Sequence, residues 1–99
     1  MRWVLHTDRG EALSSVDLVG RSSWLLSCWE DTRYPMLRWV TRYFDSHFSP
    51  LQMQGLIPEL ESLLAASEEG EVSLAIEKVL HLANRCSVEP GLRLTWQGD

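Results

Sequence analysis

The sequence lacks the short motifs that mark the common catalytic and cofactor sites. It has no phosphate-binding loop of the GxxxxGK type, no GxGxxG, no HExxH and no serine in a GxSxG turn. Its two cysteines, Cys28 and Cys86, form no CxxC, and no histidine stands near either at zinc-finger spacing. We therefore expect no cofactor, no metal site and no enzyme activity. Both cysteines lie among apolar residues, which favours buried, reduced thiols over a disulfide or a reactive thiol.

Long hydrophobic runs are also missing. No apolar stretch approaches the roughly 20 residues that would span a bilayer, and the sequence does not open on basic residues followed by an apolar run. We therefore expect a cytoplasmic protein. The 99 residues, 44% of them apolar, are enough for one hydrophobic core. Residues 1–99 are accordingly expected to form a single domain.

Basic residues are missing from the middle of the sequence. Six acids and no base occur from Leu51 to Glu77, and residues 51–99 account for the whole net charge of −5. Residues 1–50 balance six arginines against six acids. An acidic half argues against direct nucleic-acid binding, which needs cations to displace phosphate counterions, and favours a protein partner with a basic surface. The alternative is a helix face whose acids contact only solvent.

Alternating and apolar segments predict four strands. Residues 2–7 and 11–19 flank the turn residues DRG, which predicts a hairpin. Residues 36–40, MLRWV, form an apolar run that only an arginine interrupts, and this predicts a central strand. Residues 92–96, LRLTW, alternate cleanly, which predicts a fourth strand with its arginine and threonine facing outward.

Three helices are predicted between these strands. The first is short, follows a serine pair that can cap it, and carries Trp24 and Trp29. The second and third lie on either side of the break SEEGE, residues 67–71. The third runs from Glu71 to about Ser87, where apolar residues recur at helical spacing.

The second helix has the clearest predicted start. Ser49 and Gln52 have the spacing of a capping box, and Pro50 suits the first helical position. Pro58 lies within the apolar stripe that follows, and it predicts a kink near Gly55 or a restart at Pro58 itself.

The predicted order of elements is β-β-α-β-α-α-β. Short strands mixed with helices, without strict βαβ alternation, favour the α+β class. We expect a small, mainly antiparallel sheet with helices packed on one face. A sheet with one open face could also pair into a homodimer.

Asp45 and His47 stand two residues apart among aromatic residues, in RYFDSHFS. In an extended segment they would share a face, and a carboxylate can orient a histidine for acid–base chemistry. The favoured interpretation is structural. Asp45 would bond its own backbone in a turn, and His47 would lie in the approach to the helix capped at Ser49.

Two blocks of the sequence carry a family resemblance. Residues 34–53 contain L-R, then Y-x-D, F and Q-M at fixed spacing, and residues 85–99 contain R-C-x-x-E-P-x-L-x-L and a final G-D. The matching positions are Leu37, Arg38, Tyr43, Asp45, Phe48, Gln52, Met53, Arg85, Cys86, Glu89, Pro90, Leu92, Leu94, Gly98 and Asp99. Together the blocks resemble a widespread family of small bacterial proteins of uncharacterised role.

The chain departs from the family pattern in the turn. Thr41 stands where relatives carry an acid, and Arg42 and Phe44 replace a proline and a glycine. The turn is therefore expected to differ in shape. Size, acidity and the lack of catalytic motifs are similar to those of immunity proteins of bacterial polymorphic toxin systems, which neutralise a cognate toxin by tight binding.

Three functions fit these observations. The leading one is an immunity or antitoxin-like protein that binds a toxin through an acidic surface with exposed tryptophan anchors, although all five tryptophans could instead be in the core. The residues expected to contact the partner are Glu59, Glu61, Glu68, Glu69, Glu71, Trp24 and Trp29. An alternative is a phage-type inhibitor of a nucleic-acid-binding complex, whose acids imitate phosphate. The third is a small enzyme or ligand-binding protein built around Arg38, Tyr43, Asp45 and His47.

Overall fold

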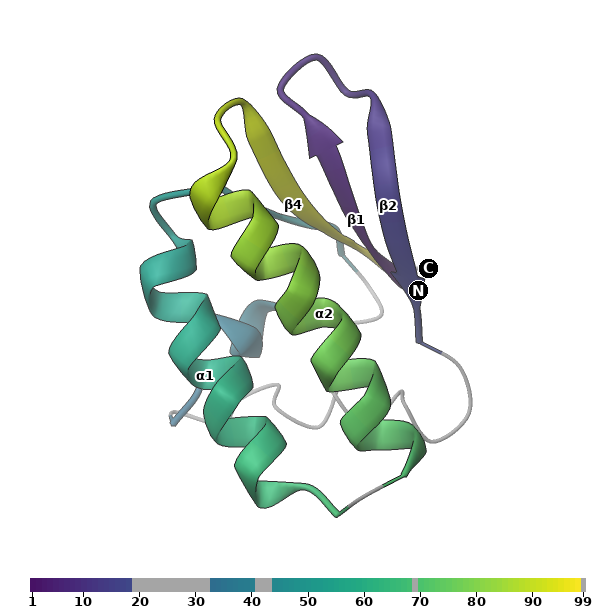
Figure 1. The fold of residues 1–99 in the computed structure, drawn as a ribbon, viewed down its shortest axis with the longest axis vertical. Coiled ribbons are helices and arrows are strands. Elements are labelled where there is room, and N and C mark those ends of the chain that lie inside the picture. Colours follow the sequence, from purple (N-terminus) through teal and green to yellow (C-terminus); the bar gives the residue numbers. More distant parts are fainter. Residues whose placement is uncertain (19–32, 41–43, 69, 99) are drawn as a thin grey trace.

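One antiparallel sheet organises the molecule. The computed structural model describes residues 1–18, 33–40, 44–68 and 70–98. Its four strands are β1 (Arg2–Thr7), β2 (Ala12–Asp17), β3 (Ser46–Phe48) and β4 (Leu92–Gln97), and they lie in the order β2-β1-β4-β3. The first and last strands of the chain are therefore neighbours at the centre of the sheet, and the two ends of the chain lie close together (Figure 1).

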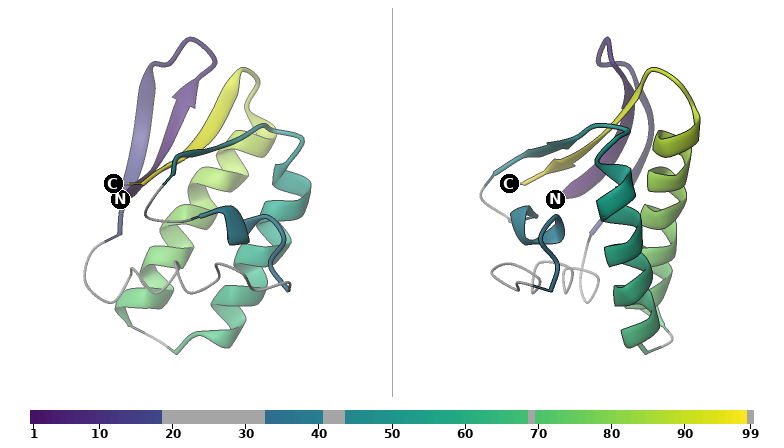
Figure 2. Two further views of the ribbon diagram at one scale, coloured as in Figure 1. Left: turned by 180° about the vertical axis from the view of Figure 1, so that it is seen from behind. Right: turned by 90° about the vertical axis from the view of Figure 1, so that its left-hand side faces the viewer.

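Two long helices form the second layer. α1 (Met53–Ala66) and α2 (Glu71–Val88) run antiparallel as a hairpin and cover one face of the sheet (Figures 1 and 2). A short 3-10 helix, η2 (Leu37–Trp39), lies against α1. The α+β class, with helices on one face of a small antiparallel sheet, is confirmed. No helix in the described part of the chain is long and apolar enough to cross a membrane.

The hydrophobic core lies between the two layers. Trp3 of β1 stands at its centre, with its ring centroid 5.7 Å from that of Phe48 and 5.5 Å from that of Trp96. The helices close the core with stripes of helical period, as the sequence predicts. The buried apolar residues of the helices are Met53, Leu56, Leu60, Leu63, Ala75, Ile76, Val79, Leu80, Leu82, Ala83 and Cys86.

The predicted central strand at residues 36–40 is wrong. This segment contains the 3-10 helix η2 instead, and Leu37 and Val40, three positions apart, are the residues that reach the core. An apolar run of five residues does not distinguish a strand from a short helical turn. The third strand is β3, which the sequence prediction placed in a turn.

α1 begins later than predicted. Ser49 and Gln52 do form the reciprocal bonds of a capping box: Ser49 N–H donates to Gln52 Oε1 at 2.7 Å, and Gln52 N–H donates to Ser49 Oγ at 3.3 Å. Regular α-helix nevertheless starts only at Met53. α1 continues through Pro58, so the predicted restart there is wrong. A proline this close to the helix start removes a single hydrogen bond, to the Gln54 carbonyl one turn earlier.

The remaining elements follow the sequence closely. The hairpin turns at Gly10, whose φ of +90° suits glycine. α2 ends at Val88, one residue beyond its predicted end, and β4 matches its predicted start at Leu92. The short predicted helix with Trp24 and Trp29 lies outside the described residues.

Candidate functional site

The outer face of the sheet brings two histidines together on one threonine. His6 Nε2 lies 2.6 Å from Thr95 Oγ1, and His47 Nδ1 lies 3.1 Å from the same oxygen. The strand register explains this meeting. His47 is directly opposite Thr95 across β3 and β4, and His6 is opposite Arg93, one outward position along β4. Thr95 points away from the helices, as the alternation of β4 predicts, yet only 4% of it is exposed.

When both rings are neutral, the hydrogen-bond chain defines their tautomers. His6 Nδ1 lies 2.8 Å from the Thr7 carbonyl oxygen, which can only accept, so Nδ1 carries the proton. His6 Nε2 then accepts the Thr95 hydroxyl proton. The hydroxyl oxygen in turn accepts from His47 Nδ1–H. His47 is exposed, and its Nε2 therefore presents a lone pair to solvent, where it could act as a base or bind a ligand.

A shallow groove lies on the same face of the sheet. It has a volume of about 380 Å³ and is lined by parts of β1, β2 and β4, among them Arg2, Val4 and Gln97. Val4 is directly opposite Thr95, so the groove adjoins the His6–Thr95–His47 cluster. This volume is near the lower end of the range of small-molecule pockets, about 300 to 1,000 Å³.

Asp45 makes a long-range bond, so the prediction that it bonds its own backbone is wrong. Its Oδ1 accepts a hydrogen bond from the Gly98 backbone N–H at 2.9 Å, 53 residues away. The bond ties the segment before β3 to the residue after β4, because these strands are neighbours. His47, predicted to lie in the approach to the helix capped at Ser49, belongs to the short strand β3 just before it.

Arg38 does not join Asp45 and His47. It lies on η2, and its guanidinium carbon is 5.7 Å from the ring centroid of Trp39. Within the described ranges no hydrogen bond or ion pair connects Arg38 to Asp45 or His47. Tyr43, the fourth member of the predicted group, lies outside these ranges. The group that the sequence predicted is therefore not assembled in the part of the structure that can be described.

Glu59 is buried, so the prediction that it belongs to an exposed acidic surface is wrong. Only 8% of the residue is exposed, and its carboxylate accepts the backbone N–H of Met36 at 3.0 Å and of Leu37 at 2.9 Å. These amides are at the N-terminal end of η2, where a 3-10 helix has donors without intrahelical partners. The carboxylate of Glu59 therefore holds η2 against α1.

The other predicted acids that the structure describes are on the surface of the helical hairpin, two of them next to its turn. Glu61 is exposed in the second half of α1, Glu68 follows the end of α1, and Glu71 begins α2. None of the three forms an ion pair with another described residue. Glu69, Trp24 and Trp29, also predicted to contact a partner, lie outside the description.

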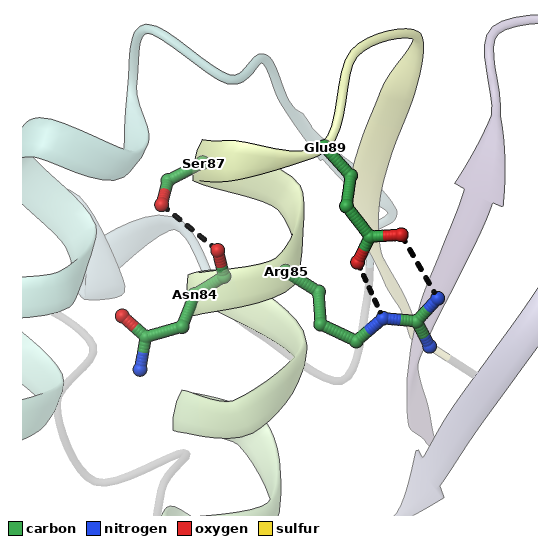
Figure 3. Close-up of polar contacts among 4 residues, drawn as sticks. All are labelled: Asn84, Arg85, Ser87 and Glu89. Carbon is green, nitrogen blue, oxygen red and sulfur yellow. Dashed lines mark hydrogen bonds and ion pairs between the residues drawn. The ribbon is translucent and has the colours of Figure 1, made fainter.

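Arg85 and Glu89, two of the positions on which the predicted family resemblance rests, form an ion pair at the other end of α2. Arg85 Nε donates to Glu89 Oε2 at 2.7 Å, across one helical turn (Figure 3). The hydrogen bond from Arg85 holds the pKa of Glu89 below its usual value, and the same bond raises the pKa of Arg85. The pair stabilises the final turn of α2, since a cation near a helix C-terminus is favourable. Asp99 lies outside the described residues.

Metal ligation and thiol chemistry each place requirements on the described residues. In the described ranges no group of three or more His, Cys, Asp or Glu side chains could hold a metal ion. Cys86 is a free, buried thiol, as predicted, and burial raises its pKa despite the opposing charge of Arg93. A thiol that stays protonated is a poor nucleophile. Cys28 lies outside the description.

Sequence reasoning missed three residues of interest. Thr95 was expected on the outer face, but its contact with His6 depends on which strands pair, and alternation carries no such information. Trp39 was placed inside a strand, whereas 64% of it is exposed. An exposed tryptophan is the residue type that most often anchors a protein interface.

No protein-family model, curated protein sequence or solved structure matches the chain. The resemblance to small bacterial proteins with an immunity-like function therefore stays a prediction.

Proposed function

We propose that this chain is a cytoplasmic binding protein that neutralises a protein partner, as an immunity or antitoxin-like protein neutralises its toxin. The contact surface is the turn of the helical hairpin, with Glu61, Glu68 and Glu71. The partner offers a basic surface, such as a nuclease cleft.

The observation that carries this proposal is the set of exposed carboxylates at one end of the helical layer, without partner cations in the described part of the chain. The last turn of α1 contains no basic residue. Glu68 follows the partly negative C-terminus of α1, whereas Glu71 offsets the partly positive N-terminus of α2, so the net charge at the turn comes from the carboxylates themselves. A basic partner relieves this potential and is drawn to it by long-range attraction.

A capture experiment with matched charge reversals tests the proposal. The tagged chain is used to capture proteins from lysate of its native cells, with products of neighbouring genes included, at low and at high salt. We expect one stoichiometric basic partner, weakened by salt, whose toxicity the chain suppresses on co-expression. Glu68→Lys/Glu71→Lys should lose the partner.

The control variant, Asp8→Lys/Glu11→Lys, makes the same change of charge at exposed acids in and beside the β1–β2 turn. It should retain the partner. If both variants capture the partner equally well, the hairpin turn is not the contact surface. No partner at either salt would overturn the proposed function.

A second candidate is binding of a small ligand on the outer face of the sheet. It is favoured by the exposed His47 ring and by the groove, whose Val4 is opposite the Thr95 that His47 contacts. Titration with the small-molecule fraction of the native cells, followed by amide NMR shifts, tests it. Shifts that are confined to the four strands and vanish in His47→Ala would support this function, and unchanged spectra would exclude it.

A further inference from the structure

β2 is an open edge of the sheet. Within the described residues it pairs only with β1, so the backbone N–H and C=O groups along its other side have no strand partner. It is six residues long, contains no proline or lysine, and has Ser14 and Ser15 at its centre. Exposed edges of this kind readily pair with another strand, and proteins usually protect them with charges, prolines or short length.

A groove lies between this edge and α2. Its volume is about 480 Å³, and β2 forms one wall with Ser14, Ser15 and Val16. The α2 wall contains Leu74, which is 56% exposed although it is large and apolar. The groove thus joins an unpaired strand edge to an apolar contact surface.

The α2 wall is a single stripe along the helix. Leu74, Glu77, Lys78 and His81 are separated by three, four and seven positions, so they lie on one face. Glu77 and Lys78 are exposed, and neither forms an ion pair with another described residue. Lys78 is also the only lysine of the chain.

This stripe is complementary to itself. In two antiparallel helices related by a twofold axis, the numbers of any two residues that face each other add up to the same total. When Glu77 faces Lys78 of a second copy, Lys78 faces Glu77 in return, and Leu74 faces His81 at both ends. One axis therefore gives two ion pairs and two leucine–histidine contacts, the pattern of an isologous dimer interface.

We propose that a second copy of this chain docks on this surface, with β2 pairing antiparallel to its own copy and the two α2 stripes in contact. A twofold axis perpendicular to the sheet keeps the helices of both copies on the same side of the joined sheet. The same axis that pairs the edges therefore also brings the stripes together. The reciprocal charge pattern favours an identical copy over an unrelated strand.

Light scattering after size-exclusion chromatography, over a range of concentrations, measures the dimer. Glu77→Lys and Lys78→Glu each place like charges opposite one another twice, and each should raise the dissociation constant at least about tenfold, since like charges across an interface are costly. An equimolar mixture of the two variants restores opposite charges at both positions. It should form a heterodimer that neither variant forms with itself.

The mixing experiment distinguishes a lost interface from a lost fold, because a variant that fails to fold would not regain dimerisation when a second variant is added. The double variant Glu77→Lys/Lys78→Glu should again dimerise. A carbodiimide, which joins carboxylates to amines at contact distance, should link Glu77 of one wild-type copy to Lys78 of the other. A monomeric wild-type chain at all concentrations, or single variants that dimerise as the wild type does, would overturn the proposal.

Discussion

The two faces of the β1–β4 strand pair differ in polarity. The face toward the helices is apolar and fully buried, with Trp3, Leu5, Leu94 and Trp96. The opposite face carries His6, Arg93 and Thr95 in the alternate positions, and its polar groups bond to one another across strands. Stability therefore depends mainly on the inner face, and side chains on the outer face can change at lower cost.

The largest expected effect comes from the inner face. Leu94→Ala should lower the free energy of unfolding by about 2 to 5 kcal/mol, because it removes buried methyl groups and leaves a cavity in a packed core. Arg93→Ala, the neighbour on the outer face, should change it by no more than about 0.5 kcal/mol. Urea unfolding followed by tryptophan fluorescence measures both. Similar losses for the two variants would contradict the division between the faces.

The elements with the most regular patterns were predictable. α2 and β4 have periods of 3.6 and 2 over their whole lengths, and packing against the core requires only that one face be apolar. Residues 36–40 were not predictable in this way. Their 3-10 conformation is held by Glu59, more than twenty residues along the chain, and no local propensity reports that contact.

The same contrast between buried and exposed positions applies to two acids on α1. Glu59→Ala should cost about 1 to 3 kcal/mol, because it leaves the amides of Met36 and Leu37 without an acceptor in a buried position. Glu61→Ala, on the exposed side of α1, should stay within about 0.5 kcal/mol. Glu59→Gln keeps one oxygen acceptor, so its loss of unfolding free energy should lie between those of Glu59→Ala and Glu61→Ala. Equal stability of the Glu59 and Glu61 variants, measured by urea unfolding, would argue against the capping role.

The contacts on the outer face could not be predicted from the sequence, for a related reason. Asp45 and His47 were identified as notable residues, but their partners are Gly98 and Thr95, 53 and 48 residues away. The pairing of β3 with β4 decides both contacts. The alternation within one strand does not show which other strand it pairs with.

A smaller effect is expected from Thr95→Val, which preserves shape and removes the hydroxyl that both rings share. The loss should be about 0.5 to 1.5 kcal/mol, the net value of a typical hydrogen bond. Long-range ¹H–¹⁵N NMR should show that the ring tautomer of His47 is no longer defined, whereas His6 keeps its tautomer through the Thr7 carbonyl. Thr95→Ser should retain both tautomers. An unchanged His47 tautomer in Thr95→Val would mean that the threonine does not connect the two rings.

The smallest effect is expected at the exposed Arg85–Glu89 pair, which lies on neither face of the sheet. Because the pKa of Glu89 is lowered in the folded state, the pair stabilises the protein above the unfolded-state pKa of the carboxyl, and this contribution is lost as the pH falls through the folded-state value. Glu89→Gln should therefore unfold slightly more easily than the wild type near neutral pH. The difference should disappear in acid, and it should shrink with added salt, since exposed ion pairs are screened.

A double-mutant cycle measures the coupling free energy of the pair apart from the separate effects of each residue. It uses urea unfolding of Arg85→Gln, Glu89→Gln and the double variant, each near neutral pH and in acid. A coupling free energy that persisted in acid would contradict its assignment to the charged carboxylate. It would indicate that the side chain of Glu89 supports the end of α2 by packing instead.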